Sequence, residues 1–447
     1  MNTRFHRPAV TSDLASGTFD PEVRPPGGHT VGGMKNLLVL GGGTAGTMAA
    51  NKLRRVLSPA DWSITVVDSD DAHRYQPGYL FIPFGTYRPE QVTKSRRKVL
   101  SRDVALVYGE IDAVKADDNA VALTDGRVLD YDVLIIATGV TPRPDQTPGM
   151  IDDMGGDVHE FYSYAGSVAL AEKLRSWTGG RLVVHISEMP IKCPVAPLEF
   201  TFLADAYFRE KGMREQVEIT YVTPLDAAFT KPIAAQAFGD TLEKKGVSVV
   251  PDFMIEQVDA EGHRIVAFDE TEVPYDLLVT IPVNMGAECI ARSGLGNELN
   301  LVPVDKFTQQ AVSHPNIFAL GDANDIPASK AGSVAHFEVD VFVENFLQYI
   351  AGVEMSHRFD GHANCFIETG DRKAMLIDFN YDTEPLPGTF PYGSFGPMQL
   401  LKESRLNHLG KLGFRWIYWN MLMPGRTLPL PTHMSLSGKR TDLINAN

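Results

Sequence analysis

Apolar runs near the start of the chain follow the pattern of a parallel sheet with a crossover helix. Residues 34–40 form a buried-strand run that leads directly into a glycine-rich turn, and a helical pattern follows from about 47 to 57. A second apolar run, 62–67, ends at Asp68. Strand, glycine turn, helix, strand and acidic residue in this order predict a complete βαβ unit.

The rest of the chain repeats this alternation and predicts a second α/β unit. After a proline-rich link at 142–148, the apolar pattern starts again with a helix and a strand. The further predicted strands are 104–107, 120–124, 131–136, 181–186, 217–222, 277–281, 316–320 and 374–379, and the predicted helices are 166–177 and 197–211. The predicted fold class is therefore α/β, with two Rossmann-like dinucleotide-binding units.

Composition and charge narrow the class of protein. The 447 residues are 44% hydrophobic and 22% charged, as expected for a globular enzyme of two or three α/β domains. A formal charge of −15 argues against a nucleic-acid partner, because neutralising phosphates requires a basic face. The first 33 residues contain no apolar run typical of a secretory signal. We also expect no transmembrane helix, since no apolar span of about 20 residues occurs.

The glycine-rich turn has the spacing of a pyrophosphate-binding loop, with Gly41, Gly43 and Gly46. One glycine allows the tight turn, one lets the pyrophosphate approach the backbone, and one allows the helix to pack closely on the strand. The N-terminus of the following helix offers unpaired N–H groups to the phosphates. Asp68, 22 residues beyond Gly46, is placed to accept hydrogen bonds from ribose hydroxyls. A generic glycine turn is the alternative interpretation.

Two further stretches indicate which dinucleotide binds. Residues 131–139, which end in Ala-Thr-Gly, and 316–322, which end in Gly-Asp, resemble the second and third fingerprints of the FAD-dependent pyridine nucleotide–disulfide oxidoreductase superfamily. The resemblance implies FAD as the cofactor. It also implies that Thr138 and Gly139 mark the crossing between domains and that Asp322 binds the ribitol side of FAD.

The second unit lacks the glycine motif that a nicotinamide cofactor needs. In relatives that take electrons from NAD(P)H, this unit carries its own glycine-rich turn after its first strand. Here residues 186–193 contain no glycine, and Glu188 would repel a pyrophosphate. The turn carries Cys193 instead. We therefore expect the electrons to come from a donor other than NADH.

The chain has three cysteines, and two of them stand in recognisable surroundings. The segment 192–197, Lys-Cys-Pro-Val-Ala-Pro, and the pair Cys365-Phe366 resemble the two cysteine segments of sulfide:quinone oxidoreductase. This resemblance covers nearly the whole chain from Met34. It implies that Cys193 and Cys365 meet over the flavin, and that sulfide is oxidised to polysulfide or sulfur with electrons passing to a membrane quinone. Two unrelated buried thiols are the alternative.

The chemistry of thiols suits this interpretation, because a thiolate is a competent nucleophile and exchanges with disulfides. Some members of the family have a third working cysteine shortly after Ala-Thr-Gly. Residues 140–150 contain none, which indicates a variant with two cysteines. The remaining Cys289 stands at the start of an apolar helical pattern, and we expect it in the core.

Further site residues are implied by the resemblance. Glu199, six residues after Cys193, matches an acid that handles protons near the sulfur site, although a solvated glutamate on a helix face is the alternative. Lys330 matches a lysine near the flavin, where a cation stabilises the anionic reduced ring. Phe366 and Lys373 are assigned to the quinone pocket by position alone. No metal site is predicted.

Between residues 398 and 426 the acidic balance of the chain reverses. The basic residues there are Lys402, Arg405, Lys411, Arg415 and Arg426, beside a single acid, Glu403. One apolar stripe at helical spacing consists of Leu409, Leu412, Trp416, Trp419 and Met423. Such a helix suits a membrane interface, and a core-packing or dimer helix is the alternative. With the family resemblance we expect a peripheral, monotopic membrane protein, while homo-oligomer formation stays open.

We expect five segments along the chain. They are an N-terminal extension, 1–33; the first part of the FAD-binding domain, 34–148; a second Rossmann-like domain, 149–284; the second part of the FAD-binding domain, 285–355; and a C-terminal quinone and membrane-contact region, 356–447. The expected function is that of an FAD-dependent sulfide:quinone oxidoreductase. The alternatives are the flavin subunit of a flavocytochrome c sulfide dehydrogenase, a single-subunit NADH:quinone dehydrogenase, and a redox-sensing flavoprotein that is not an enzyme.

Overall fold

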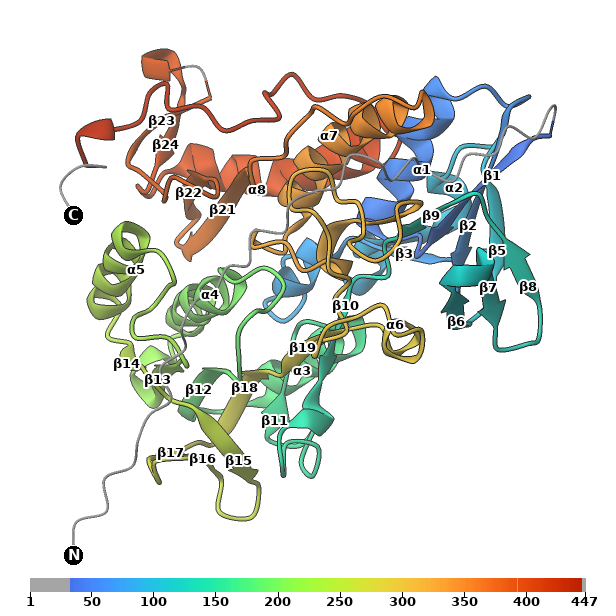
Figure 1. The fold of residues 1–447 in the computed structure, drawn as a ribbon. Coiled ribbons are helices and arrows are strands. Elements are labelled where there is room, and N and C mark those ends of the chain that lie inside the picture. The colour runs from blue at the N-terminus through green and yellow to red at the C-terminus, as the bar shows by residue number, and fades with distance from the viewer. Residues whose placement is uncertain (1–32, 392, 444–447) are drawn as a thin grey trace, which may run out of the picture. The chain divides into compact units, whose positions relative to one another are not determined.

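Two five-stranded parallel sheets form the framework of the chain (Figure 1). The computed structural model describes residues 33–391 and 393–443, so nearly all of the predicted extension 1–33 lies outside the described residues. The first sheet, in spatial order, contains β20 (Ile317–Ala319), β9 (Val133–Ile136), β1 (Lys35–Leu40), β2 (Trp62–Asp68) and β5 (Ala105–Tyr108). The second contains β11 (Val158–His159), β18 (Leu277–Ile281), β12 (Gly180–Ile186), β13 (Val217–Val222) and β14 (Ser248–Val250). The predicted α/β fold with parallel sheets is confirmed.

The central strands are buried because helices cover the sheets. Every residue of β9 and β18 is buried, as continuous apolar runs in parallel sheets require. In the first unit, α1 (Thr44–Val56) packs against α7 (Gly332–Ile350). In the second, the covering helices are α3 (Tyr164–Ser176), α4 (Ala196–Glu210) and α5 (Pro232–Lys244).

Short antiparallel elements decorate and connect the two units. They are the pair β3 (Ala72–Arg74) and β4 (Thr93–Ser95), the sheet β6 (Ile111–Lys115), β7 (Ala120–Leu123) and β8 (Val128–Asp130), and the sheet β15 (Ile255–Asp259), β16 (Arg264–Ala267) and β17 (Glu272–Pro274). The short helices are α2 (Arg96–Val99) and α6 (Glu288–Arg292). Cys289 in α6 is buried in a hydrophobic cluster, which confirms its predicted place in the core.

The chain crosses between the two units twice at one place. β10 (Val140–Arg143) follows β9, and β19 (Val283–Gly286) follows β18. These two crossing strands pair antiparallel with each other. Each unit therefore delivers its strand ends to the same junction.

The C-terminal region adds a mixed sheet and a helix. The sheet order is β21 (Ala363–Gly370), β22 (Lys373–Phe379), β24 (Met398–Leu400) and β23 (Gly388–Phe390). Helix α8 (Arg405–Ile417) packs on β21 and β22, and α4 of the second unit also packs against β21 (Figure 1). The sequence pattern predicted β22 but missed β21, because Asn364, Glu368 and Thr369 interrupt its apolar residues.

The predicted apolar stripe of the C-terminal helix is not one continuous face. Leu409 and Trp416 are 61% and 63% exposed, whereas Trp419 is 8% exposed and Met423 is fully buried. A π-helical turn, Tyr418–Leu422, follows α8 and widens the helical spacing. The prediction of a single stripe is therefore wrong. Leu409 and Trp416 face outward and Leu412 packs partly buried against the core. Trp419, within the π-turn, and Met423, after it, are buried.

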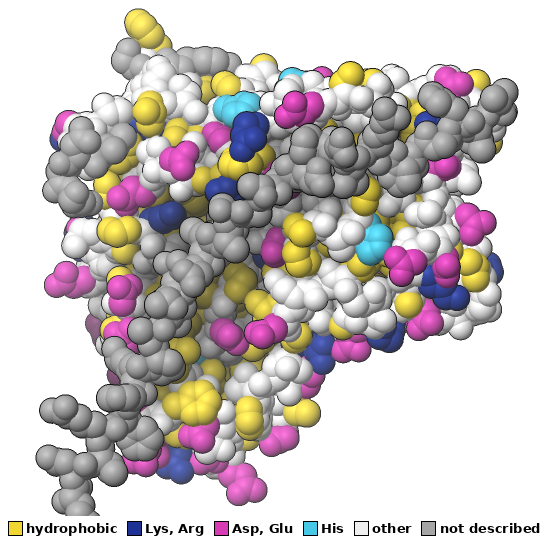
Figure 2. Space-filling model, in the orientation of Figure 1, with side chains coloured by type: hydrophobic (Ala, Val, Ile, Leu, Met, Phe, Trp, Pro, Cys, Tyr) yellow, Lys and Arg dark blue, Asp and Glu magenta, His cyan; other side chains and the backbone are white. Residues whose placement is uncertain are grey.

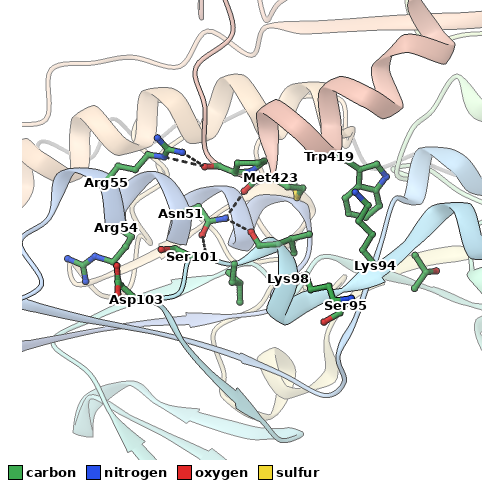
Figure 3. A pocket seen from close by; sticks show the side chains of 14 residues that line it. Asn51, Arg54, Arg55, Lys94, Ser95, Lys98, Ser101, Asp103, Trp419 and Met423 are labelled. Atoms are coloured by element: carbon green, nitrogen blue, oxygen red, sulfur yellow. Dashed lines mark hydrogen bonds between the residues drawn. The ribbon is translucent and has the colours of Figure 1, made fainter.

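Polar contacts fix the end of this segment to the first unit (Figure 3). The Asn51 side-chain amide on α1 donates to the carbonyls of Met423 (2.6 Å) and Val99 (2.8 Å). The Asn51 Oδ1 accepts from the Ser101 N–H at 2.7 Å. Arg55 donates to the Pro424 carbonyl from two nitrogens, at 2.9 and 3.2 Å. The C-terminal segment is thus joined to α1 by one buried hydrogen bond from Asn51 and two exposed ones from Arg55.

The distribution of surface charge and the apolarity of the helices are relevant to binding of nucleic acids and membranes. On the face drawn in Figure 2, acidic side chains are scattered and basic side chains do not gather into a patch. Among the described residues, no helix combines the length and the apolarity that crossing a bilayer requires.

Replacing Asn51 with Ala should destabilise the protein. The change leaves the buried carbonyls of Val99 and Met423 without these donors, and we expect a loss of about 2–4 kcal/mol in the free energy of unfolding. Urea unfolding measures it. Asn420→Ala is the matched control, because its amide is exposed and donates to the Trp416 carbonyl of the same helix; its effect should stay within about 0.5 kcal/mol. Equal losses in the two variants would contradict the role of Asn51.

Candidate active site

One cavity of about 550 Å³ collects most of the predicted site residues. Its lining comes from the glycine-rich turn, the turn before α4, the start of α7, strand β21 and helix α8. The predicted residues in the lining are Gly41, Gly43, Asp68, Thr138, Gly139, Cys193, Glu199, Asp322, Lys330, Cys365 and Phe366. Gly46 and Lys373 are not among the lining residues.

The glycines of the first turn have two different roles: two allow close packing of the backbone, and one leaves open space beside it. Gly41 has φ +92°, and a Cβ there would lie 2.4 Å from the Ala137 carbonyl oxygen. A Cβ on Gly46 would lie 1.9 Å from the Gly41 oxygen, so Gly46 allows α1 to start against the turn. A Cβ on Gly43 would meet no described atom within 4 Å, although Gly43 lines the cavity. The space above Gly43 therefore fits an external group beside the N-terminus of α1.

Asp68 at the end of β2 is held by two partners. Its Oδ2 accepts from the Gly42 N–H at 2.7 Å and lies 2.9 Å from Arg96 Nη1. Arg96 is almost fully buried and also lines the cavity. Sequence reasoning missed Arg96, because its 28-residue separation from Asp68 carries no local signal.

Thr138, Asp322 and Lys330 are polar residues of the cavity lining. Thr138 Oγ1 is buried and makes no hydrogen bond to any described residue, which fits a ligand at this place. Burial raises the pKa of Asp322, against the pull of Lys330. Lys330 Nζ donates to the carbonyls of Asp322 (3.2 Å) and Asn324 (2.6 Å). These groups fit the polar part of a bound cofactor.

Glu338 on α7 supports this corner and was not anticipated. It accepts from the Gly321 N–H at 2.8 Å and from the Asn324 amide at 2.6 Å. Burial raises its pKa to about 8, although these hydrogen bonds oppose the shift. Glu338 therefore stabilises the turn that contains Gly321 and Asp322 through hydrogen bonds from α7.

The turn that carries Cys193 is held from two sides. Cys193 has φ +47°, in the left-handed region. Its N–H donates to the Lys330 carbonyl at 2.5 Å, and its own carbonyl accepts from the Tyr162 hydroxyl at 3.0 Å. These bonds set the thiol of Cys193 in the wall of the cavity.

Cys365, which is far from Cys193 in the sequence, lines the same cavity. It lies in β21, where Ser333 Oγ is 3.7 Å from its sulfur. Both cysteines are partly exposed and free. Burial raises the pKa of each thiol, and for Cys193 the nearby Lys411 cation opposes the rise. The structure thus brings the two predicted cysteines to one cavity.

Glu199 on α4 is buried, so the alternative of a solvated glutamate is wrong. Its Oε1 accepts from Lys411 Nζ at 2.7 Å and from the Glu368 N–H at 2.8 Å. Its Oε2 has no hydrogen-bond partner in the described part of the chain. Burial raises the pKa of Glu199, although Lys411 opposes the shift. The carboxyl is therefore positioned to gain or lose a proton inside the cavity.

The structure corrects the predicted position of Lys411 on a basic helix face. The sequence grouped it with surface cations, but its ammonium is largely buried and also donates to the Phe366 carbonyl at 2.8 Å. Its partner Glu199 is 212 residues away, and such a pairing has no local signature. Lys411 lines the cavity and belongs to the candidate site.

Phe366 and Lys373 are not brought together. Phe366 lines the cavity, with its ring against Gly410 of α8. Lys373 pairs with Gly370 at the hairpin end of β21 and β22, whereas Phe366 pairs with Leu376 farther along. The Lys373 ammonium is exposed and lies 4.0 Å from Glu403. Lys373 therefore does not line this cavity, and its assignment to the quinone pocket stays a prediction.

Part of the cavity lining is apolar. The apolar lining from the C-terminal region consists of Phe366, Phe390, Pro391, Met398, Phe414, Ile417, Leu422, Leu428 and Leu430. Within residues 33–391 and 393–443, no three His, Cys, Asp or Glu side chains gather as a metal site requires. The arrangement combines a glycine-rich turn beside a helix N-terminus, two thiols, a buried acid and an apolar part of the lining.

Comparison with known proteins places this arrangement in a family. Residues 35–184 and 199–337 match the model of the pyridine nucleotide-disulphide oxidoreductase family. The chain is 26% identical to the mitochondrial sulfide:quinone oxidoreductases of Dictyostelium discoideum and Mus musculus, each over 401 residues, 87% of this chain and 86% of the relative. Its fold is similar to that of the Aquifex aeolicus sulfide:quinone oxidoreductase, with a TM-score of 0.73 and 17% identity over 88% of this chain and 92% of that one. The chain belongs to the pyridine nucleotide-disulphide oxidoreductase family.

Proposed function

We propose that this protein is a sulfide:quinone oxidoreductase that oxidises sulfide to polysulfide or sulfur and delivers the electrons to a quinone. The observation that carries the proposal is that Cys193 and Cys365 line one cavity together with the glycine-rich turn. Relatives named for this activity, similar over most of the chain, support it. The turn after β12 supports a donor other than NADH, because it holds Cys193 where a glycine motif would be needed.

FAD is the cofactor of this chain. We assign its pyrophosphate to the turn at Gly41 and Gly43 and its ribose to Asp68. The flavin side is assigned to Thr138, Gly139, Asp322 and Lys330, which line the same cavity. Bound FAD supplies a two-electron acceptor that a quinone reoxidises.

The two cysteines perform the sulfur chemistry. In the oxidised protein Cys193 and Cys365 form a disulfide, which hydrosulfide opens: one sulfur–sulfur bond forms to the substrate, and the other cysteine leaves as a thiolate. The resulting persulfide and that thiolate then join as a trisulfide, and the two electrons that this oxidation releases would pass to FAD. The balance is one H₂S and one disulfide to one trisulfide, two protons and two electrons. Longer chains form by repetition.

Lys411 stabilises negative charge on sulfur in this reaction, and Glu199 accepts protons. The Lys411 ammonium favours the thiolate form of Cys193, whose pKa burial would otherwise raise further. The unpartnered Oε2 of Glu199 is available to take a proton that the sulfur releases. The buried ion pair keeps both groups at the cavity wall.

The apolar part of the cavity lining, which the C-terminal region supplies, is proposed as the quinone site. Phe366, Phe414 and Ile417 are part of its lining and present hydrocarbon surface. A lipid-soluble acceptor is matched by such a lining, whereas a protein-borne haem would need an exposed docking surface. This part of the lining lies beside α8, which is proposed to meet the membrane.

Helix α8 is proposed as the membrane contact of a peripheral, monotopic protein. Leu406, Leu409 and Trp416 are exposed on one side of the helix at spacings of three and seven residues. The exposed cations Lys402 and Arg405 flank them. Farther along, Lys94 lies 4.6 Å above the Trp419 ring, in a cavity that Lys98 also lines (Figure 3). An apolar row with neighbouring cations suits an interface of anionic lipids.

Two glycine variants test the cradle for FAD. Gly43→Ala should leave the FAD-free protein as stable as the wild type and weaken FAD binding at least about tenfold, because its Cβ occupies the space of the cofactor. Gly46→Ala should lower the melting temperature of the FAD-free protein itself, since its Cβ overlaps the Gly41 oxygen. Flavin titration and thermal unfolding measure the two effects. Wild-type affinity in Gly43→Ala would refute the assignment.

Three cysteine variants test the reaction. Cys193→Ser and Cys365→Ser should retain FAD and lose anaerobic flavin bleaching by sulfide at least about 100-fold, because neither can form the disulfide. Cys289→Ala is the control, since this thiol is buried outside the cavity, and should bleach normally. Stopped-flow absorbance of the flavin is the measurement. Bleaching of the wild type by NADH but not by sulfide would overturn the proposed function.

A charge placed on α8 tests the membrane contact. The double variant Leu409→Glu, Trp416→Glu should bind vesicles of phosphatidylcholine with phosphatidylglycerol at least about fivefold more weakly than the wild type. Activity with a soluble short-chain quinone should be unchanged. Phe268→Glu is the control, because Phe268 is 71% exposed in the second unit. The alternative is that this face forms a homo-oligomer contact. In that case the wild type would not bind vesicles and would elute as a dimer, whereas the double variant would elute as a monomer.

A further inference from the structure

A second cavity, of about 970 Å³, lies outside the candidate active site (Figure 3). Among the described residues, none lines both this cavity and the one at the two cysteines. Its wall comes from the second half of α1, from β4 and α2, from the loop that follows α2, and from residues 419–424 after α8. The proposed sulfur chemistry uses none of these residues.

The wall of this cavity is basic, although the chain as a whole is acidic. Its charged side chains are Arg54, Arg55, Lys94 and Lys98, together with a single acid, Asp103. The whole chain carries a formal charge of −15. An excess of cations at one place on an acidic protein indicates a site for an anion.

Two of the four cations are free of backbone and carboxylate partners. The guanidinium groups of Arg54 and Arg55 both donate to backbone carbonyls. Lys94 and Lys98, in contrast, form no ion pair with a described carboxylate. Burial lowers the pKa of Lys94, and no carboxylate opposes the shift. Within the described part of the chain, the two lysines are therefore available to a ligand.

Two further polar atoms of the lining residues lack a partner. Thr93 Oγ1 and Trp419 Nε1 are buried and make no hydrogen bond to any described residue. Lys94 Nζ lies 4.6 Å from the centroid of the Trp419 ring, so the cation and the indole are neighbours at this wall (Figure 3). An ammonium and an indole N–H can only donate hydrogen bonds. Both therefore match acceptor oxygens, and a phosphate group offers several together with negative charge.

The position of the cavity favours a lipid as the source of the phosphate. Trp419 lies in the π-turn that follows α8, and Leu409 and Trp416 of α8 are exposed and are proposed to contact the membrane. Tryptophan is enriched at the level of the lipid headgroups, and lysines at this level attract anionic lipids. The volume exceeds that of a phosphate alone and leaves room for the glycerol part of a headgroup.

We propose that this cavity binds the phosphate of an anionic glycerophospholipid headgroup while α8 contacts the apolar layer of the same membrane. Lys94 and Lys98 pair with the charge of the phosphate, and the Trp419 N–H and the Thr93 hydroxyl donate to its oxygens. The inference rests on the membrane contact in the proposed function, and it does not depend on the sulfur chemistry.

The test is vesicle co-flotation of the FAD-loaded protein. The wild type should bind vesicles of phosphatidylcholine with phosphatidylglycerol at least about tenfold more tightly than vesicles of phosphatidylcholine alone. The double variant Lys94→Gln, Lys98→Gln should bind the neutral vesicles like the wild type, because α8 is intact. Its preference for the anionic vesicles should fall below about threefold. FAD content and melting temperature establish that the variant is folded.

The matched control removes two lysines elsewhere on the surface. Lys115 in β6 and Lys244 in α5 are exposed and line neither cavity. The double variant Lys115→Gln, Lys244→Gln lowers the net charge by the same amount and should keep the full preference for anionic vesicles. An equal loss in both double variants would assign the effect to overall charge and would overturn the site.

Inorganic phosphate distinguishes a lipid from a soluble phosphate ester. Replacing chloride with phosphate at equal ionic strength should leave the preference for anionic vesicles in place, since a lipid in the bound membrane has a high effective concentration. Calorimetry with inorganic phosphate is the second arm. Saturable binding that Lys94→Gln, Lys98→Gln abolishes, without any preference for anionic vesicles, would assign the cavity to a soluble compound and overturn the lipid proposal.

The outcomes separate this inference from the proposed function. A wild-type preference in Lys94→Gln, Lys98→Gln would overturn the headgroup site and leave the α8 contact standing. A wild type that binds neither kind of vesicle would overturn the membrane contact, and the headgroup site with it. Failure of sulfide to bleach the flavin would overturn the proposed sulfide oxidation and leave the vesicle results unaffected.

Discussion

The buried contact between Glu199 and Lys411 is the constraint on which the candidate site depends. It joins α4 of the second unit to α8 of the C-terminal region, and the Glu368 N–H adds β21 to the same carboxylate. Removing one partner of such a pair costs about 3–5 kcal/mol, because the other charge is left buried alone. β21 carries Cys365, and the turn before α4 carries Cys193. The contact that holds these segments together therefore also holds the two sulfurs at one cavity.

The longer strands of the two parallel sheets could be predicted closely because their signal is local, whereas the short edge strands β11 and β14 were not predicted. A strand buried on both faces is a continuous apolar run, and the predicted strands 217–222 and 277–281 match β13 and β18 in both bounds. The glycine-rich turn was recognisable for the same reason, since its chemistry lies within six residues. Burial of Cys289 followed from an apolar helical pattern around it. None of these inferences required knowledge of a distant partner.

The electrostatics of the candidate site could not be predicted, because its partners are remote in sequence. Lys411 looks like one of five cations on an amphipathic helix until Glu199, 212 residues earlier, is seen beside it. Glu368 and its hydrogen-bond partner His408 are 40 residues apart, and Glu368 lies in β21, whose polar residues hid this strand from pattern analysis. The π-turn after Ile417 likewise has no sequence signature, yet it decides which tryptophan faces outward. Long-range burial, rather than propensity, determines these features.

The turn at Cys193 shows that the site is built at some cost to stability. A non-glycine residue in the left-handed region is strained by about 1–3 kcal/mol and persists only where its surroundings hold it. Here the Lys330 carbonyl and the Tyr162 hydroxyl hold it from both sides. Lys330 also lines the cavity that is proposed to hold the cofactor, so one residue contacts both the thiol-bearing turn and this cavity. A glycine would relieve the strain at this turn, and it would remove the sulfur from the cavity wall.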